Sequence, residues 1–503
     1  MSTSRTPVAL HARLGGLCVS ALLLAAPAFG DVSAWTPVVT GGFGDPGNDS
    51  MSPPMEFGGM LYTGASNFMT GASMWRSPDG TTWTQVGPVG LGDALNTALS
   101  PGAVFRDRLY AGTSNIAAGG QIWSTSDGVL WTQEIVNGFG DPSNIGIFPT
   151  TVFSGQLYAF TNKLGGGAEV WRTADGSRWT QVNVDGFGDP FNSIVTDGRV
   201  FEGALYAGTF NPLAGGQIWR SLDGTNWTQV GPNGLGDPNN ALVAPGAVFR
   251  GRLYAGTNSF LGGGQVWRSD DGTSWTMVGS PGFGDPSIPD ISPNVVYGNE
   301  LFASVGGDAS SSGGTIWRSV DGEHWSPITA PGFGNPDNFA LSLGGSFRGE
   351  LYVSTTNPVT GLELRRWDLS PLGSNYCTAS PNSTGRVASL SLAGDASLSA
   401  NCVRVAVSGC PAGERGIFFV GATQADVPFG DGRLCIGGPL RRIQPMVTIG
   451  ADGSASFNLD YSAWYGRLVT PGSGTNYQLW YRDPQASGAG FNLSDAVQVV
   501  HTR

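Results

Sequence analysis

Short runs of alternating apolar and polar residues recur along the chain, separated by turns rich in Gly, Asp and Pro. In one segment, residues 102–106, 108–113, 121–124 and 130–135 each have the length and alternation of a half-buried β-strand. An Asp-Gly pair separates the third run from the fourth, and this pair is typical of tight hairpins because Gly tolerates a positive φ. The pattern therefore predicts four short antiparallel strands in this segment.

The same segment repeats along residues 50–367. The string Asp-Gly-x-x-Trp recurs at intervals of 48 residues, the last interval being 50, and a second Trp precedes each of these turns. A string related to Leu-Tyr-Ala-Gly-Thr begins at residues 61, 109, 157, 205, 253, 301 and 351. Repeats of about 40–50 residues with four strands each are typical of the blades of a β-propeller.

The two ends of the repeat region complement each other. It opens with a single strand of the fourth type at Trp35–Val39 and ends with three strands, at about 345–367, that lack a fourth. We therefore expect residues 31–369 to form a seven-bladed β-propeller closed by the N-terminal strand, which would protect its edges. The alternative is an open solenoid, which would need terminal caps that the sequence does not show.

The remaining segments predict export and a second domain. Residues 1–30 combine a basic start, a short apolar run and Ala-Pro-Ala, which is typical of a cleaved secretory signal peptide. After a Ser/Pro-rich linker at 370–384, alternating runs in residues 385–503 predict a β-sandwich. The all-β protein would then be secreted, on the cell surface or periplasmic.

Four cysteines of the C-terminal segment are expected to form two disulfides, because oxidising compartments favour them in small exported domains. Their pairing is left open among three connectivities, and the residues are Cys377, Cys402, Cys410 and Cys435. The strings Asn375-Tyr376-Cys377, Gly432–Gly438 and Trp480–Asp483 resemble a C-terminal module of exported bacterial proteins of planctomycete or myxobacterial type.

The turn string Ser77-Pro78-Asp79-Gly80-Thr81-Thr82-Trp83 and its copies resemble the Asp-box (BNR) repeat of sialidase-like β-propellers. The resemblance implies a structural Asp that accepts hydrogen bonds from turn amides, which the general behaviour of Asp in turns supports. These residues are Asp79, Asp127, Asp175, Asp223, Asp271 and Asp321. The chain departs from sialidases because it has no Arg-Ile-Pro motif and no expected Arg triad on the loop face.

A second repeated string, Gly-[Phe/Leu]-Gly-Asp-Pro-x-Asn, lies in the loops that lead into each first strand, which we call the loop face. Its acidic or amide positions are Asp45, Asp93, Asp141, Asp189, Asp237, Asp285 and Asn335. A ring of carboxylates and loop carbonyls would suit Ca²⁺, or a cationic or polyhydroxylated ligand. The competing interpretation is turn chemistry, in which each Asp caps its own loop, and identical repetition favours it.

Composition excludes several functions. The net charge of −12 leaves no basic footprint for nucleic acid, and no later segment is long and apolar enough to span a membrane. Only three His are present, which argues against a Ser/His/Asp triad and His-rich zinc sites. Acids that could serve a two-carboxylate glycosidase remain at Asp185, Asp290, Asp308 and Asp337, and Lys163 and Arg199 are the expected loop-face cations.

These observations favour an exported, non-catalytic, monomeric propeller that binds an extracellular glycan or protein ligand on the loop face at the central channel. The first alternative is a glycoside hydrolase or lyase that uses acids of the same face, and not a typical sialidase. The second is a structural protein of the cell envelope.

Overall fold

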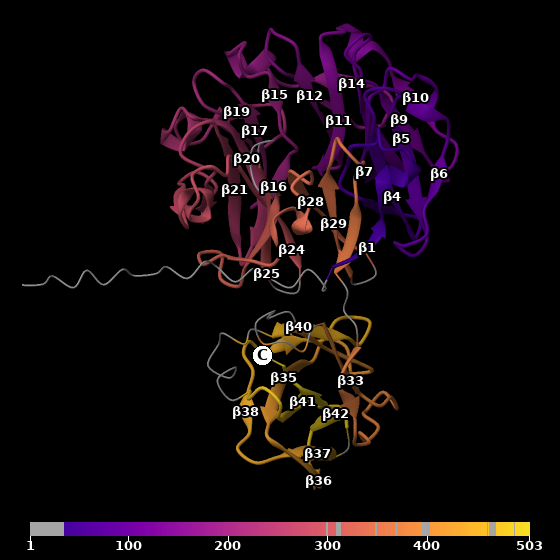
Figure 1. The fold of residues 1–503 in the computed structure, drawn as a ribbon, viewed down its shortest axis with the longest axis vertical. Coiled ribbons are helices and arrows are strands. Elements are labelled where there is room, and N and C mark those ends of the chain that lie inside the picture. Colours follow the sequence, from indigo (N-terminus) through magenta and orange to yellow (C-terminus); the bar gives the residue numbers. More distant parts are fainter. Residues whose placement is uncertain are drawn as a thin grey trace, which may run out of the picture.

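The computed structural model describes residues 35–297, 300–307, 313–347, 350–367, 371–394, 396, 398, 403–459, 461, 469–486 and 488–502. The expected signal peptide, Asp308 and Cys402 lie outside these ranges. Within them the chain is built of strands and turns, and the helical elements are single 3-10 turns. A large β-propeller and a smaller β-sandwich follow each other along the chain (Figure 1), and no described helix is long and apolar enough to cross a membrane.

The propeller repeats one unit of four antiparallel strands, as in β7 (Ala98–Phe105), β8 (Arg108–Ser114), β9 (Ile122–Thr125) and β10 (Thr132–Ile135). The other first strands are β2 (Ser50–Met51) with β3 (Met55–Phe57), β11 (Asn144–Phe153), β15 (Ile194–Val195) with β16 (Arg199–Phe201), β20 (Asn240–Phe249), β24 (Asp290–Tyr297) and β28 (Ala340–Phe347). The other second strands are β4 (Met60–Ser66), β12 (Gln156–Lys163), β17 (Ala204–Phe210), β21 (Arg252–Ser259), β25 (Glu300–Gly306) and β29 (Glu350–Thr356).

The outer half of each unit consists of a third and a fourth strand. The other third strands are β5 (Ser73–Ser77), β13 (Val170–Thr173), β18 (Ile218–Ser221), β22 (Val266–Ser269), β26 (Thr315–Ser319) and β30 (Leu364–Trp367). The other fourth strands are β6 (Thr84–Val86), β14 (Trp179–Gln181), β19 (Trp227–Gln229), β23 (Thr276–Val278) and β27 (Ser326–Pro327), together with β1 (Trp35–Val39). The 3-10 turns are η2 (Gly41–Gly44), η3 (Val89–Gly92), η4 (Asn137–Gly140), η5 (Asp185–Gly188), η6 (Asn233–Gly236), η7 (Pro281–Gly284) and η8 (Pro331–Gly334).

The N-terminal strand closes the propeller, as the sequence predicted. β1 pairs antiparallel with β30, with Trp35 opposite Trp367. Both indole rings are buried and stack with their centroids 5.4 Å apart. The backbone of β1 therefore covers the edge that β30 would otherwise leave open.

Turn glycines join adjacent units by a second contact. Gly80 has a φ of 77°, and a Cβ at this position would lie 1.9 Å from the hydroxyl oxygen of the buried Tyr352. The same approach occurs at Gly128–Tyr62, Gly176–Tyr110, Gly224–Tyr158, Gly272–Tyr206 and Gly322–Tyr254. Because Gly80 belongs to the first repeat and Tyr352 to the last, this contact also crosses the closure.

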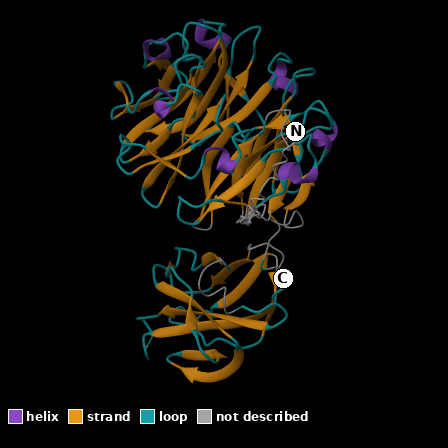
Figure 2. Ribbon diagram, turned by 60° about the vertical axis from the view of Figure 1, so that its left-hand side comes forward, coloured by secondary structure: helices purple, strands orange, loops and turns teal. Residues whose placement is uncertain are grey.

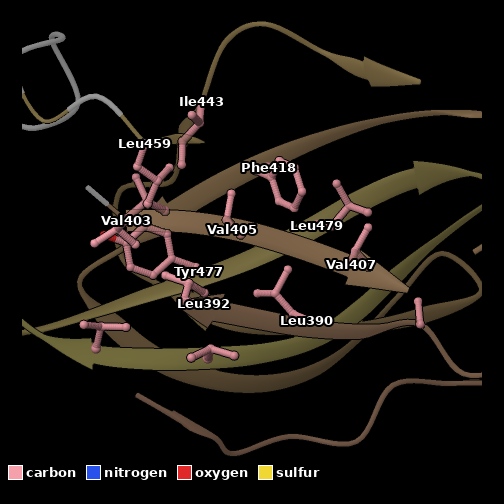
Figure 3. Close-up of a cluster of buried hydrophobic side chains, with 14 of the residues drawn as sticks. Leu390, Leu392, Val403, Val405, Val407, Phe418, Ile443, Leu459, Tyr477 and Leu479 are labelled. Atoms are coloured by element: carbon pink, nitrogen blue, oxygen red, sulfur yellow. The ribbon is translucent and has the colours of Figure 1, made fainter. Parts of the chain in front are cut away.

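The C-terminal module is a sandwich of two antiparallel sheets. One sheet contains β31 (Pro371–Leu372), β33 (Ser389–Gly394), β34 (Val403–Ser408) and β40 (Ala455–Leu459). The other contains β32 (Ser374–Asn375), β35 (Arg415–Gly421), β38 (Arg441–Arg442), β39 (Val447–Thr448), β41 (Gly474–Arg482) and β42 (Phe491–Val500), and the hairpin of β36 (Thr423–Phe429) and β37 (Gly432–Gly437) stands apart. Leu390, Val405, Phe418 and Leu479 lie in the core between the sheets (Figure 3).

The module contains one disulfide among its described residues, between Cys377 and Cys435, whose Cα atoms are 6.2 Å apart. Cys410 carries a free thiol in this structure, and its expected disulfide stays a prediction because Cys402 lies outside the described residues. The thiol is buried in the core between the sheets, and this burial raises its pKa to about 12. Its surroundings are therefore apolar packing, which disfavours the thiolate that disulfide exchange requires.

Polar contacts connect the module to the propeller. Asn458 of β40 donates a hydrogen bond to Glu300 Oε2 of β25 at 3.1 Å. The guanidinium of Arg404, on β34, lies 4.8 Å from the ring centroid of Tyr297 at the end of β24. Figure 1 accordingly shows β40 at the end of the module that faces β24 and β25, and the propeller and the module also lie end to end in Figure 2.

Replacing Trp35 tests the closure. Trp35→Ala removes a buried indole and its stacking on Trp367, so we expect the free energy of unfolding to fall by about 3–5 kcal/mol. Urea titration followed by circular dichroism measures this loss. The control Leu130→Ala, at a side chain that is 75 % exposed, should change it by less than about 0.5 kcal/mol, and equal effects of the two variants would contradict the closure.

Removing the disulfide tests its contribution to the module. The double variant Cys377→Ser/Cys435→Ser loses the cross-link between residues 58 positions apart, which should lower the free energy of unfolding by about 2–4 kcal/mol. Calorimetry should show the thermal transition of the module moving down while the propeller transition stays. Reductant added to the wild-type protein should reproduce the shift, and an unshifted transition in both cases would oppose the prediction.

Candidate functional site

The loop-face aspartates follow directly after the 3-10 turns. Each turn holds a Gly and a Phe or Leu at positive φ, such as Gly138 at 63° and Phe139 at 61°. The next Asp uses Oδ1 to accept a hydrogen bond from the backbone N–H two residues further on. This contact joins Asp45 to Gly47, Asp93 to Leu95, Asp141 to Ser143, Asp189 to Phe191, Asp237 to Asn239, Asp285 to Ser287 and Asn335 to Asp337.

Buried asparagines tie these loops to the neighbouring strand. In the first repeat, Asn48 Nδ2 donates to the Gly42 carbonyl at 2.7 Å, and Asn67 Nδ2 donates to Asn48 Oδ1 and Asp45 Oδ2 at 3.1 Å each. The same Asn-to-Asp bond joins Asn115 to Asp93 at 3.0 Å and Asn211 to Asp189 at 2.9 Å. The loop-face aspartates therefore have the hydrogen bonds that the turn interpretation requires.

Each of these acids lies in its own loop. Within the described residues, no three or more His, Cys, Asp or Glu side chains are grouped so that they could hold a metal ion. Bonds from the hydroxyl and backbone N–H of Ser143 lower the pKa of Asp141 to about 2, and Ser287 lowers the pKa of Asp285 in the same way. The carboxylates are thus stabilised by their loops, and the arrangement that we expected to suit Ca²⁺ is not assembled among the described side chains.

The aspartates of the Asp-Gly-x-x-Trp turns also accept hydrogen bonds from the backbone of their own turns. Asp79 Oδ1 accepts hydrogen bonds from the N–H groups of Thr82 and Thr81, at 2.7 and 2.9 Å, which lower the pKa of this carboxyl. Equivalent pairs of backbone bonds reach Asp127, Asp175, Asp223, Asp271 and Asp321. These acids stabilise turns at the outer strands.

The third repeat replaces the neutral network by ions. Lys163 stands where the first, second, fourth and seventh repeats have Asn, and Glu169 stands where the second, fourth and fifth repeats have Gln. The buried Lys163 ammonium pairs with the buried Glu169, with Asp141 at 3.1 Å and with Asp185 at 3.2 Å. Burial alone would lower the pKa of Lys163, but the bonds to Glu169 and Asp141 outweigh it and raise that pKa.

The candidate catalytic acids that the structure describes do not form hydrogen bonds with one another. Asp185 binds Lys163 and accepts a 2.7 Å hydrogen bond from Gln181 Nε2. Asp290 starts β24, where burial raises its pKa to about 6, and Asp337 is exposed in the loop after η8. No hydrogen bond joins any two of these three acids in the described structure, and Asp308 lies outside it.

A small polar pocket opens between the first strands of three consecutive units. We call it the channel pocket; it has a volume of about 160 Å³ and is lined by Thr196, Asp197, Arg199, Ala244, Pro245, Gly246, Ser292, Pro293 and Asn294. Arg199 Nε and Asn294 Oδ1 are buried atoms without a hydrogen-bond partner. Among the described side chains, neither Arg199 nor Asp197 forms an ion pair. A buried donor and a buried acceptor are therefore left for a ligand or water.

The channel pocket breaks the repeat. Asp197 replaces a Pro that stands at the equivalent positions 53, 101, 149, 245 and 293, and Arg199 replaces a residue without charge. Residues 196–198 interrupt the first strand between β15 and β16, and the Thr151 hydroxyl donates to the Gly198 carbonyl at 2.9 Å. Comparing the repeats position by position would have singled out Asp197 and Asn294, which the sequence analysis passed over.

A family model supports the propeller fold. Residues 125–259 match a family model described as the DUF6242 beta propeller domain, and no curated protein matches the chain. A prolyl endopeptidase structure is 14 % identical with a TM-score of 0.41; the match covers 73 % of this chain and 55 % of that one, so the chain spans only about half of its length. The BP39L lectin from Burkholderia pseudomallei is 13 % identical (TM-score 0.44; 62 % and 96 % covered), and the Trypanosoma rangeli sialidase is 11 % identical (TM-score 0.35; 90 % and 92 %).

Reverting the ionic network tests its dependence on charge pairing. Lys163→Asn leaves Glu169 buried without its cation, and we expect it to lower the free energy of unfolding by about 3–5 kcal/mol. The double variant Lys163→Asn/Glu169→Gln restores the Asn–Gln pair of the second and fourth repeats and should recover most of this loss. Urea titration measures both, and a double variant as unstable as the single one would refute the compensation.

Proposed function

We propose that the protein is an exported, non-catalytic binding protein whose propeller takes a sugar residue of an extracellular glycan into the channel pocket. The observation that carries the proposal is that Arg199 and Asn294 line one cavity, while the Nε atom of the first and the Oδ1 atom of the second are buried without a hydrogen-bond partner. The disulfide between Cys377 and Cys435 is compatible with an extracellular location. A monomer suffices for this function, because one chain supplies the whole pocket.

The same proposal includes the finer organisation expected from the sequence. Residues 31–369 would form a seven-bladed Asp-box propeller behind a cleaved signal peptide at 1–30, and residues 370–384 would link it to the module at 385–503. The seven repeats of the Leu-Tyr-Ala-Gly-Thr string and the pairing of β1 with β30 support this organisation.

The chemistry of the pocket fits a polyhydroxylated ligand. A sugar hydroxyl can donate to Asn294 Oδ1 and another can accept from Arg199 Nε, since each hydroxyl is both donor and acceptor. Leaving such buried atoms unpaired costs about 1–3 kcal/mol each, and a ligand gains the part of this cost that water does not already offset. The pocket of about 160 Å³ is smaller than the roughly 300–1,000 Å³ of common ligand sites, which suits a single sugar residue.

Binding without hydrolysis is supported by the acids. A two-carboxylate glycosidase needs its acids about 5–10 Å apart across the scissile bond. Asp185 is instead held by Lys163 and Gln181, and Asp197 is the carboxylate of the channel pocket. A single carboxylate beside a guanidinium can orient a sugar, but it does not provide the acid and base of that mechanism.

Isothermal titration with the full protein tests the proposal. The probes are neutral cello- and xylo-oligosaccharides and acidic oligogalacturonates. We expect saturable binding to at least one of them, and Arg199→Gln should weaken it by about tenfold, because a hydrogen bond from a charged donor contributes about 1.5 kcal/mol or more. Preference for the galacturonates would indicate that the guanidinium takes a carboxylate.

The matched control is Arg178→Gln, which removes the same charge from an exposed turn of the outer strands. This variant should bind like the wild-type protein. No binding to any probe, or equal weakening by the two arginine variants, would reject the channel pocket as a sugar site. Hydrolysis of a probe, seen as new reducing ends, would favour the glycosidase alternative.

A further inference from the structure

The C-terminal module contains an apolar groove on the side of a sheet that faces away from its core. β35, β41 and β42 alternate, so Phe418 and Leu479 enter the sandwich core while Phe419, Trp480 and Leu493 lie on the opposite side. This second side is covered only in part by the β36–β37 hairpin. A cavity of about 610 Å³ remains, lined by Ile417, Phe419, Phe429, Leu434, Leu440, Arg442, Met446, Trp480, Phe491 and Leu493.

The walls of the groove are fixed in place. The disulfide holds Cys435 of β37, and Gln478 accepts from Cys435 N at 3.0 Å and donates to the Arg433 carbonyl at 2.8 Å. At the hairpin tip, the Asp431 carboxylate accepts hydrogen bonds from the N–H groups of Ala489 and Gly490 at 2.7 and 2.9 Å. Both ends of β37 are therefore anchored, and the groove is present without a ligand that would have to open it.

The rim of the groove exposes large apolar side chains. Phe429 is 47 % exposed and Met446 is 53 % exposed. Aromatic rings form one continuous surface below them, with the Phe491 centroid 5.4 Å from Phe429 and 5.5 Å from Trp480. The volume and the apolar lining are within the range of small-molecule sites, which bind mainly through apolar contact and a few polar groups.

The polar group of this groove is positive. Arg442 is its one charged lining residue, and Arg441 precedes it on β38; both are exposed, and no ion pair or hydrogen bond joins either side chain to a described residue. The chain as a whole carries a net charge of −12. Successive side chains of a strand point to opposite faces, so Arg442 alone brings its guanidinium to the apolar groove, where it is complementary to a ligand with one anionic end.

We propose that this groove binds a small amphipathic carboxylate, with the apolar body against Phe419, Trp480 and Phe491 and the carboxylate at Arg442. The body is aliphatic or aromatic, and the two arms of the experiment below distinguish these sources. The site is independent of the channel pocket, because the hairpin lies at the end of the module farthest from the propeller (Figure 1). A failure of sugar binding would leave this proposal unaffected.

Displacement of the anionic dye 1-anilinonaphthalene-8-sulfonate from the full protein measures this binding. The aliphatic arm uses hexanoate, octanoate and decanoate below their self-association concentrations, and the aromatic arm uses 3-phenylpropanoate and 2-naphthoate. In the arm that fits, we expect the affinity to rise by roughly fourfold for each buried CH₂ group. Decanol, at matched concentration, should bind more weakly than decanoate.

Two variants separate the charge from the apolar surface. Arg442→Gln should weaken the carboxylates by about three- to fivefold and leave decanol unchanged, as expected for a solvent-exposed ion pair. Phe429→Ser should weaken carboxylate and alcohol alike. Arg386→Gln, at an exposed arginine shortly before β33 in the other sheet of the module, is the matched control and should alter neither.

Several outcomes would overturn the proposal. These are the absence of saturable displacement, equal affinities for decanoate and decanol in the wild-type protein, or an Arg386→Gln effect as large as that of Arg442→Gln. A dimer in sedimentation analysis that Phe429→Ser dissociates would mean that a second copy occupies the groove. Thermal unfolding of each variant ensures that the comparison is made between folded proteins.

Discussion

The antiparallel pairing of β1 with β30 connects segments that lie more than 300 residues apart, and it determines whether the propeller is a closed body. Without it, β30 would present an open edge, and the stacking contact between the indoles of Trp35 and Trp367 would be lost. The contact of Gly80 with Tyr352 crosses the same seam. Since each unit packs mainly on its two neighbours, this one junction gives the first and last units the surroundings that the others have.

In the propeller, the residues that repeat stabilise turns, and the residues proposed to bind a ligand are ones that differ between repeats. Asp79 and Asp45 recur in almost every repeat, and their carboxylates are used by backbone N–H groups of their own turns. Arg199 and Asn294 each have a buried polar atom without a hydrogen-bond partner, and both residues depart from the repeat. A closed ring needs the same turn in every unit, whereas a single binding site needs a place where one unit differs. The turn residues and the residues of the proposed site therefore occupy different positions of the repeat.

A departure from the repeat is not by itself a site. Lys163 and Glu169 differ from their counterparts as much as Arg199 does, yet they satisfy each other in the interior. The difference is electrostatic: a buried ion pair neutralises both charges, while the guanidinium of Arg199 has no carboxylate bonded to it among the described residues. The groove of the module follows the same logic, because Arg442 is unpaired beside exposed apolar surface.

The all-β fold, the strand order within each unit and the closure at Trp35 could be predicted from the amino-acid sequence, because the spacing of residues and the turn residues reflect local preferences that recur in each repeat. The sequence did not determine whether Cys410 would be oxidised, since that depends on which residues the sandwich core brings near the thiol. Nor could it reveal the channel pocket, whose Thr196, Gly246 and Asn294 come from three separate strands. Those strands meet only when the units pack side by side, and that packing is a property of the tertiary structure.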